Sequence, residues 1–404
     1  MKTLLFLLIS STILYAEISN DYQKSKKEFI EKQNNFNLEK KQILHNHNSY
    51  KEEALKDFEN YKKTQQKVFD DFKDEISKIW EEAKMPSAKS LINYTNDRKT
   101  RGEIDFENEK IIVETIASSY DEAVKNLKKE LNTLVSIDTK EFNNIDPFEK
   151  ELSSIKKSNK IIDSSFKNES ILSDAIFGKK PSQKDLNNFS NKNINNKSVK
   201  VQNSPKVPNQ KVYSVVVPMP NETMINKSKE YEKEVTKQGK IRSIPRSLIF
   251  AVIHSESAYN PKARSHIPAF GLMQIVPSSA GKDVYEFLYN EEKLVSDKYL
   301  YNSTNNITMG TAYLHMLYFK YLSKIKNEES RLYCAIAAYN TGAGNVAKAF
   351  SKTTNISKAS TIINKMSSKE VYNHLLTNLP YDETKGYLQK VTSRMHSYEE
   401  IYSK

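Results

Sequence analysis

Glu256 ends an apolar helical stretch and is the residue in this sequence best placed for acid–base chemistry. Leu248 and Val252 precede it at intervals of four residues, so all three share one helix face. Asn260 and Pro261 end the helix soon afterwards. A carboxyl at the inner end of a buried helix loses hydration when it ionises, so its pKa should rise. Such an acid can give its proton to a leaving group, as a glycosidic oxygen requires, although position alone also fits a surface glutamate.

Two glycine-marked blocks follow Glu256 and offer the other groups of a site. Residues 271–275 read Gly-Leu-Met-Gln-Ile, and the amide of Gln274 can both donate and accept hydrogen bonds. Residues 337–344 read Ala-Ala-Tyr-Asn-Thr-Gly-Ala-Gly and place Tyr339 and Asn340 at the end of an apolar helix. Taken singly, each of these residues also fits a capping or turn position.

Taken in this order, the three blocks resemble the signatures of the lysozyme-like lytic transglycosylase family, the SLT domain. The resemblance covers about residues 225–400. It is strongest toward the branch of the membrane-bound lytic murein transglycosylase C proteins, because further similar stretches lie at 281–284, 310–314 and 369–372. Upstream residues are similar to the amino-terminal accessory domain of that branch: Trp80, Tyr94, Arg101, Ile104, Phe106 and 112–116. The resemblance implies an all-α lysozyme-like catalytic domain.

The resemblance also implies roles for individual residues. Glu256 matches the only catalytic acid of the family, which protonates the oxygen between N-acetylmuramic acid and N-acetylglucosamine. The same residue then acts as base on the muramyl 6-hydroxyl and closes a 1,6-anhydro ring. Substrate-binding positions carried over in the same way are Ser265, Gln274, Tyr339, Asn340 and Tyr387. For Tyr387, core packing is the alternative.

The carboxylate pattern agrees with a single-acid mechanism. Ordinary glycosidases use two carboxyls at set separations, and no second carboxylate lies inside the signature blocks. The acidic residues that follow, from Asp283 to Asp297, lie in a polar stretch that predicts solvated surface. A substrate that supplies its own N-acetyl group and hydroxyl needs no second enzyme carboxyl. Exclusion of water then favours ring closure over hydrolysis.

The amino-terminal part predicts a different architecture. Residues 17–84 lack proline and glycine and repeat an apolar residue every seven positions, which predicts a long helix, either coiled-coil-like or lying on another part of the chain. Residues 85–220 predict an accessory α+β domain. Within it we expect a hairpin at 98–116, a helix that follows Ser119 and a strand at 212–217 that pairs back onto the hairpin.

Two further stretches of the accessory domain have weaker patterns. Residues 140–175 predict polar helix, and the Asn/Lys/Ser-rich residues near 178–210 predict a disordered insertion. Residues 221–404 are helical in pattern and form the predicted catalytic domain. The expected fold class is therefore α+β overall, with an all-α lysozyme-like catalytic domain behind a small α+β domain and a long leading helix.

Charge and composition restrict the partners. The 404 residues carry a net charge of +12, with lysines spread along the chain. A basic surface suits an anionic partner such as cell-wall polymer, and equally fits plain solubility. The sequence holds no metal-ligand spacing or phosphate loop, so no cofactor is expected. The single cysteine, Cys334, predicts a small core residue. We expect peptidoglycan strands as partner, with other cell-wall proteins on the amino-terminal helix as a further option, and no nucleic acid.

The first sixteen residues have the pattern of an export signal. Lys2 gives the positive start, residues 4–14 the short apolar core, and Ala16 the small residue for cleavage. An uncleaved anchor is the alternative. The related branch is usually acylated on a cysteine after its signal, and here no cysteine precedes Cys334. The expected location is the periplasm, with at most peripheral membrane contact and association with the outer membrane or wall left open.

Two rival functions remain at this point. One is a goose-lysozyme-type muramidase that hydrolyses the same bond. The other is a non-catalytic peptidoglycan-binding assembly protein, against which the intact signatures argue. Pro268 and Phe270 stand before Gly271, where the family more often has small or polar residues, so the loop shape is expected to differ.

Overall fold

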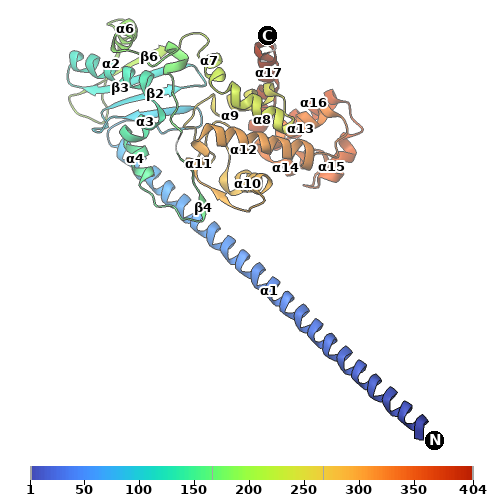
Figure 1. The fold of residues 1–404 in the computed structure, drawn as a ribbon. Coiled ribbons are helices and arrows are strands. Elements are labelled where there is room, and N and C mark those ends of the chain that lie inside the picture. Colours follow the sequence, from blue (N-terminus) through green and yellow to red (C-terminus); the bar gives the residue numbers. More distant parts are fainter. Residues whose placement is uncertain (1, 166, 267, 403–404) are drawn as a thin grey trace. The chain divides into compact units, whose positions relative to one another are not determined.

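The computed structural model describes residues 2–165, 167–266 and 268–402, and it divides into two compact units (Figure 1). One unit ends at residue 56 and the other comprises residues 57–404. Helix α1 (Lys2–Ser77) begins in the first unit and ends in the second. Its length follows from the absence of proline and glycine before Met85, because either residue would weaken a helix interior.

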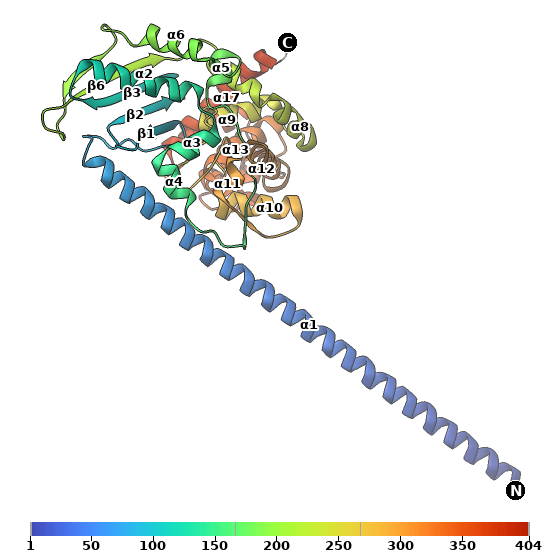
Figure 2. The same ribbon diagram turned by 60° about the vertical axis from the view of Figure 1, so that its left-hand side comes forward.

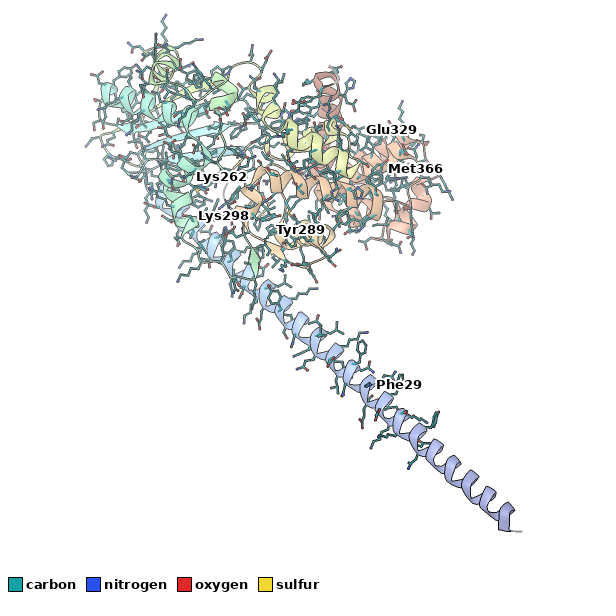
Figure 3. The ribbon with its side chains drawn as sticks, in the orientation of Figure 1. Phe29, Lys262, Tyr289, Lys298, Glu329 and Met366 are labelled. Atoms are coloured by element: carbon teal, nitrogen blue, oxygen red, sulfur yellow. The ribbon has the colours of Figure 1, made fainter. Side chains whose placement is uncertain are left out.

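In the first unit, the apolar side chains that repeat every seven residues are exposed. Tyr22, Phe29, Phe36 and Ile43 keep between 64% and 68% of their surface open to solvent, and Figure 3 labels Phe29 on this helix. The coiled-coil interpretation stays a prediction. The proposed signal, residues 1–16, lies outside the residues whose side chains are described. Across the described ranges, no helix is both long and apolar enough to cross a bilayer.

The second unit contains a five-stranded antiparallel sheet in the order β1-β2-β3-β6-β5. Its strands are β1 (Ser90–Tyr94), β2 (Thr100–Asp105), β3 (Lys110–Ala117), β5 (Lys200–Asn203) and β6 (Lys211–Pro218). The predicted hairpin is β2-β3, with Ile104 opposite Ile111. The predicted return strand is β6, which places Val215 opposite Val113. Both strand predictions are confirmed.

Alternation along the strands gives the sheet two apolar faces. One face, with Ile104 and Val113, packs on α2 (Tyr120–Ser136), whose Leu127 and Leu131 are fully buried. The other face, with Ile92, belongs to the same apolar cluster as Phe72 and Ile76 of the last turns of α1. The sheet is therefore the middle of three layers, as Figure 2 shows. The predicted cap of α2 is confirmed, since the Ser119 side chain accepts from the Glu122 backbone N–H. We call residues 57–220 the sheet module.

Two predictions for the sheet module are wrong. Residues 140–175 were expected as polar helix, but they form two short helices, a strand and a third helix: α3 (Thr139–Ile145), α4 (Pro147–Ser153), β4 (Ile161–Ile162) and α5 (Ser173–Phe177). Asp138 and Asp146 each cap a separate helix, and Pro147 occupies a first turn, so the chain cannot continue as one helix.

The stretch near 178–210, expected as a disordered insertion, forms α6 (Gln183–Asn193) and strand β5. Ser182 and Asp185 make a reciprocal capping box that starts α6. Strand β5 is fixed by pairing with β6, for example Val201 with Tyr213. Amino-acid composition predicts neither element, because the start of α6 depends on a four-residue capping motif and β5 depends on pairing with the strand that follows it.

The remaining residues form what we call the helical module, residues 221–402. Its elements are α7 (Thr223–Glu230), α8 (Glu232–Arg242), α9 (Arg246–Ser257), η1 (Pro277–Gly281), α10 (Lys282–Tyr289), β7 (Leu294–Val295), α11 (Asp297–Tyr301), α12 (Ser303–His315), η2 (Met316–Tyr321), α13 (Glu328–Thr341), α14 (Ala343–Ser351), α15 (Ile356–Ile363), α16 (Ser368–Asn378) and α17 (Asp382–Tyr402). The elements η1 and η2 are single π-helical turns. The expected fold class, α+β overall with a helical carboxy-terminal part and a long leading helix, is confirmed.

Helix α9 is the centre of the helical module. Residues 248–253 are all buried, and α17 packs along α9. Between the two modules, Lys262 pairs with Glu149 of α4 at 2.7 Å, and Figure 3 labels Lys262 there. The Asn260 side chain also donates to the carbonyl of Ala88 at 3.2 Å. The sheet module is thus fastened to the loop that follows α9.

Candidate active site

Helix α9 carries Glu256 on its last turn. The helix ends at Ser257 because Ala258 and Tyr259 both take left-handed backbone conformations, with φ of 48° and 64°. Ser257 donates a hydrogen bond to the carbonyl of Leu272 at 2.8 Å. The helix end is therefore tied to the first glycine-marked block, which fixes where the Glu256 carboxyl points.

The first block, residues 271–275, is a tight turn that requires glycine. Gly271 has φ of +75°, and a Cβ there would overlap the carbonyl oxygen of Leu300 and the side chain of Asn306. Asn306 accepts from the backbone N–H of Met273 at 2.7 Å and donates to the carbonyl of Phe270 at 2.8 Å. Sequence reasoning missed Asn306, which lies on α12 outside the signature blocks.

The second block, at the end of α13, separates its two polar residues. The hydroxyl of Tyr339 donates to the carbonyl of Met273 at 2.8 Å, so this side chain supports the first block from behind. The side-chain oxygen of Asn340 accepts from Thr384 on α17 at 2.7 Å. Asn340 faces the cleft described next, whereas Tyr339 does not line it. The predicted substrate contact of Tyr339 stays a prediction.

A cleft of about 980 Å³ lies at the end of α9. Five of the six site residues proposed from the sequence line it: Glu256, Ser265, Gln274, Asn340 and Tyr387. The side chain of Gln274 donates to the carbonyl of Gly271 at 2.9 Å, and the Ser265 hydroxyl accepts from the backbone N–H of Ala269 at 3.2 Å. The volume suits a ligand of several sugar-sized units, since small-molecule sites are typically about 300–1,000 Å³.

Burial sets the protonation of the candidate acid. It raises the pKa of Glu256 to about 7, mainly by removing water from the carboxylate. The Tyr387 hydroxyl and the charge of Lys89 act in the opposite direction, and the charge of Glu383 acts in the same direction as burial. A substantial fraction of Glu256 is therefore protonated at neutral pH, as a general acid needs.

Tyr387 is both a core residue and a residue of the cleft wall. The ring is buried in the main apolar cluster and also lines the cleft. Its hydroxyl is near enough to Glu256 to lower the pKa of that carboxyl, but among the described residues it completes no hydrogen bond of good geometry. A buried donor of this kind is available to a carboxylate or to a bound hydroxyl.

One wall of the cleft comes from segments that the sequence did not connect with the site. The last part of α1 contributes residues between Glu59 and Phe69, and the loop at 86–89 contributes Lys89. A usable signal exists in the sequence, because the apolar repeat of α1 changes phase near Leu55. That change coincides with burial of Phe58 and Tyr61, which marks the packed part of the helix.

The acidic residues behave differently from the sequence expectation in two respects. Asp297, expected on solvated surface, is buried, because Tyr61 donates to it at 2.9 Å and Lys157 pairs with it at 2.8 Å. Three further carboxylates line the cleft, namely Glu59, Asp382 and Glu383, and all three are exposed. Burial raises the pKa of the Glu256 carboxyl, whereas the hydrogen bond and charge of Lys385 lower the pKa of Asp382.

Within the described ranges, no group of three or more His, Cys, Asp or Glu side chains could hold a metal ion. Cys334 is buried, and burial raises the pKa of its thiol. It has the core position expected from its apolar helix.

Known proteins match both modules. Residues 234–362 match the family model of the transglycosylase SLT domain, and residues 51–230 match that of the membrane-bound lytic murein transglycosylase C N-terminal domain. A membrane-bound lytic murein transglycosylase C of Photorhabdus laumondii is 31% identical over 402 residues, which are 98% of this chain and 99% of that protein. The protein of that name from Salmonella typhimurium is 33% identical over 80% of this chain and 86% of its own length.

Among solved structures, the 70 kDa soluble lytic transglycosylase SLT70 of Escherichia coli is 27% identical, with a TM-score of 0.33, over 42% of this chain and 24% of that chain. The complex of the 70-kDa soluble lytic transglycosylase with bulgecin A is 26% identical, with a TM-score of 0.34, over 45% and 26%. The near full-length match to the Photorhabdus protein confirms the resemblance inferred from the signature blocks. The chain belongs to the membrane-bound lytic murein transglycosylase C family, which is a family of enzymes.

Proposed function

We propose that this enzyme cleaves the β-1,4 bond between N-acetylmuramic acid and N-acetylglucosamine in peptidoglycan strands and leaves 1,6-anhydro-muramic ends. Glu256 acts first as general acid and then as base. The observation that carries the proposal is the position of Glu256, a carboxyl with a pKa of about 7 at the wall of a large cleft. The names of the relatives point to the same substrate, murein.

The two steps use one proton carrier. In the first, the protonated Glu256 gives its proton to the bridging oxygen as the bond to the muramyl C1 breaks, and the N-acetylglucosamine side leaves as an alcohol. In the second, the Glu256 carboxylate takes the proton of the muramyl 6-hydroxyl while that oxygen bonds to C1. The acid is thereby restored, and no water is consumed.

Surrounding groups favour both states of Glu256. Burial stabilises the protonated acid before the first step, whereas the Tyr387 hydroxyl and Lys89 stabilise the carboxylate after it. Ser265, Gln274 and Asn340 present polar atoms along the cleft, and we propose that they bind the sugars beside the cut. Tyr339 is proposed to act through Met273, by holding the turn that carries Gln274.

The decisive experiment is digestion of purified sacculi by the full chain, with products identified by mass spectrometry. We expect muropeptides lighter by one water than the products of hydrolysis. Glu256→Gln should fold normally and lose activity by about 10²–10⁴-fold, the usual contribution of a general acid. The matched control is Glu286→Gln, because Glu286 is exposed on α10 and does not line the cleft.

A muramidase of goose-lysozyme type is the second candidate, and Glu383 is the observation that favours it. This carboxylate lines the same cleft and raises the pKa of Glu256, so it could serve a water. Products with full hydrolytic mass, together with inactivity of Glu383→Gln, would establish hydrolysis in place of ring closure. Binding of sacculi without release of any product would instead leave a non-catalytic wall-binding protein.

We further propose export to the periplasm by residues 1–16, with residues 17–84 forming a helix that carries an accessory domain at 85–220 and a catalytic domain at 221–404. The exposed rings at Tyr22, Phe29 and Phe36 are the proposed contact for other cell-wall proteins. Fractionation of cells producing the full chain tests the location, and amino-terminal sequencing of the product tests cleavage after Ala16.

A further inference from the structure

Glu107 connects the sheet module to the active-site cleft through three cations. It lies in the turn between β2 and β3, and its carboxylate is 2.7 Å from the ammonium of Lys89. The same carboxylate is 3.1 Å from Lys390 and 3.6 Å from Arg394, both on α17. One acidic side chain therefore serves as the shared counter-ion of three basic side chains.

All three cations contact the catalytic region. Lys89 and Lys390 line the cleft that contains Glu256. The guanidinium of Arg394 donates to the carbonyl of His254 at 3.0 Å and to the Ser255 hydroxyl at 3.1 Å. These two residues directly precede Glu256 on α9. Glu107 itself does not line the cleft, so it acts on the site only through its partners and its charge.

Glu107 balances part of the charge of these three cations. The cluster holds three positive charges and one negative charge, and the pKa of Glu107 is lowered to about 2 by Lys89, Lys390 and Arg394 against the effect of burial. It therefore stays ionised across the working range of pH. Without it, Lys89 would act on a carboxyl that must hold a proton while lacking its own counter-ion, and nearby positive charge favours the ionised form.

The groups that face Glu256 come from every element around it. Tyr387 and Glu383 face it from α17, Tyr339 from α13, and Lys89 from the loop before β1. Lys89 is in turn held by Glu107 and repelled by Lys390 and Arg394. Lys89 is the only cation in this set that acts directly on Glu256. Glu107 therefore affects the pKa of Glu256 through Lys89.

We propose that Glu107 is a positioning residue of the sheet module, which holds Lys89, Lys390 and Arg394 in place and balances their charge beside the catalytic acid. This inference rests on the proposed role of Glu256. It gives the sheet module a part in the chemistry, in addition to its part in shaping the cleft wall.

The test is the pH dependence of murein cleavage by the full chain carrying Glu107→Gln. An enzyme that needs a protonated acid loses activity as pH rises through the pKa of that acid. Removal of the Glu107 charge should move this loss to lower pH by about one unit. The variant should then be about tenfold slower than wild type at pH 8, and less than twofold slower at pH 5.

Three further variants make the result specific. Glu103→Gln is the matched control, because Glu103 lies on β2 of the same sheet, pairs with Lys84 and does not line the cleft, so this change should leave the pH profile unchanged. Lys89→Met alone should move the loss of activity to higher pH, and this holds even if Glu107→Gln fails to fold. Combined with Glu107→Gln, it should return the profile toward that of wild type.

An unmoved profile would overturn the inference, whether activity is unchanged or reduced equally at every pH. An unmoved profile for Lys89→Met would do the same. Failure of the proposed function is distinguishable from this, because it would appear as full activity of Glu256→Gln. The inference fails alone when Glu256→Gln is inactive and the profiles of the Glu107 and Lys89 variants coincide with that of wild type.

Discussion

The hydroxyl of Tyr387 lies beside the carboxyl of Glu256, buried, yet among the described residues it completes no hydrogen bond of good geometry. Its neighbour Tyr339 is also buried, but there the hydroxyl donates to the carbonyl of Met273 at 2.8 Å. The two phenols thus differ in whether their polar atom is already used in the free enzyme. That difference can be measured.

We predict opposite effects on stability for the two phenylalanine variants. Tyr387→Phe removes a buried hydroxyl that completes no hydrogen bond of good geometry, and it should leave the free energy of unfolding unchanged or raise it by up to about 1 kcal/mol. Tyr339→Phe removes a hydrogen bond and strands a carbonyl, so it should lower that free energy by about 1–2 kcal/mol. Denaturant unfolding measures both. Equal destabilisation by the two variants would show that Tyr387 is bonded after all.

Tyr387→Phe should also change the pH profile of cleavage. The hydroxyl favours the ionised form of Glu256 and so lowers its pKa. Without it that pKa should rise, and activity should persist to higher pH, by less than about one unit. This direction is opposite to the one expected for Glu107→Gln. Rates at several pH values between 5 and 9 measure the shift, and a move to lower pH would contradict the assignment.

Gly271 should tolerate no side chain. Its φ of +75° and the closeness of the Leu300 carbonyl leave no room for a Cβ. Gly271→Ala should therefore lower the free energy of unfolding by about 3 kcal/mol and distort the turn that carries Gln274. The control is Gly386→Ala, inside α17, where the added Cβ would meet no heavy atom within 4 Å apart from its chain neighbours and the backbone of its own helix. That change should stabilise the helix by about 0.5–1 kcal/mol, and comparable losses at both sites would refute the steric argument.

A buried carboxyl in the sheet module should make stability depend on pH. Burial raises the pKa of Glu130 from 4.5 to about 7, and its carboxyl accepts from Asn93 at 2.7 Å. The folded state thus keeps a proton that the unfolded state releases above pH 4.5. The stabilisation is complete below that pH and is lost as pH rises through about 7.

Glu130→Gln replaces this carboxyl with a neutral amide of the same shape. The variant should gain on the order of 2 kcal/mol over wild type at pH 8 and nothing at pH 4.5. The side-chain oxygen of Asn93, buried and unpartnered among the described residues, can accept from the new amide. Thermal unfolding at the two pH values is the measurement, with exposed Glu81→Gln as control. A variant less stable than wild type at pH 8 would contradict the raised pKa.

The sequence predicted those parts of the site whose conformation depends on neighbouring residues in the chain. Glu256 follows a run of apolar helix, and Gly271, Asn340 and their neighbours lie in short blocks whose geometry depends on adjacent residues. The strand at 212–217 was predictable because a β-branched run that ends at prolines favours extended structure over helix. These residues, and the hairpin before them, are where sequence and structure agree.

Contacts between distant residues account for the rest. Asp297 looked solvated because its partners Tyr61 and Lys157 precede it by more than 100 positions. Asn306 braces the turn at Gly271 from another helix, and nothing in its own neighbourhood signals that task. Nothing in the sequence around Lys89 or Glu107 indicates that the fold places them beside α17.

The last turns of α1 serve two purposes, since Phe72 and Ile76 cover one face of the sheet while Glu59 to Phe69 form a side of the cleft. A fragment limited to residues 221–404 would therefore lack the wall of the cleft that α1 provides. A shortened form of this enzyme, or a fusion of its catalytic part to another protein, would have to include the helix from residue 57 onward.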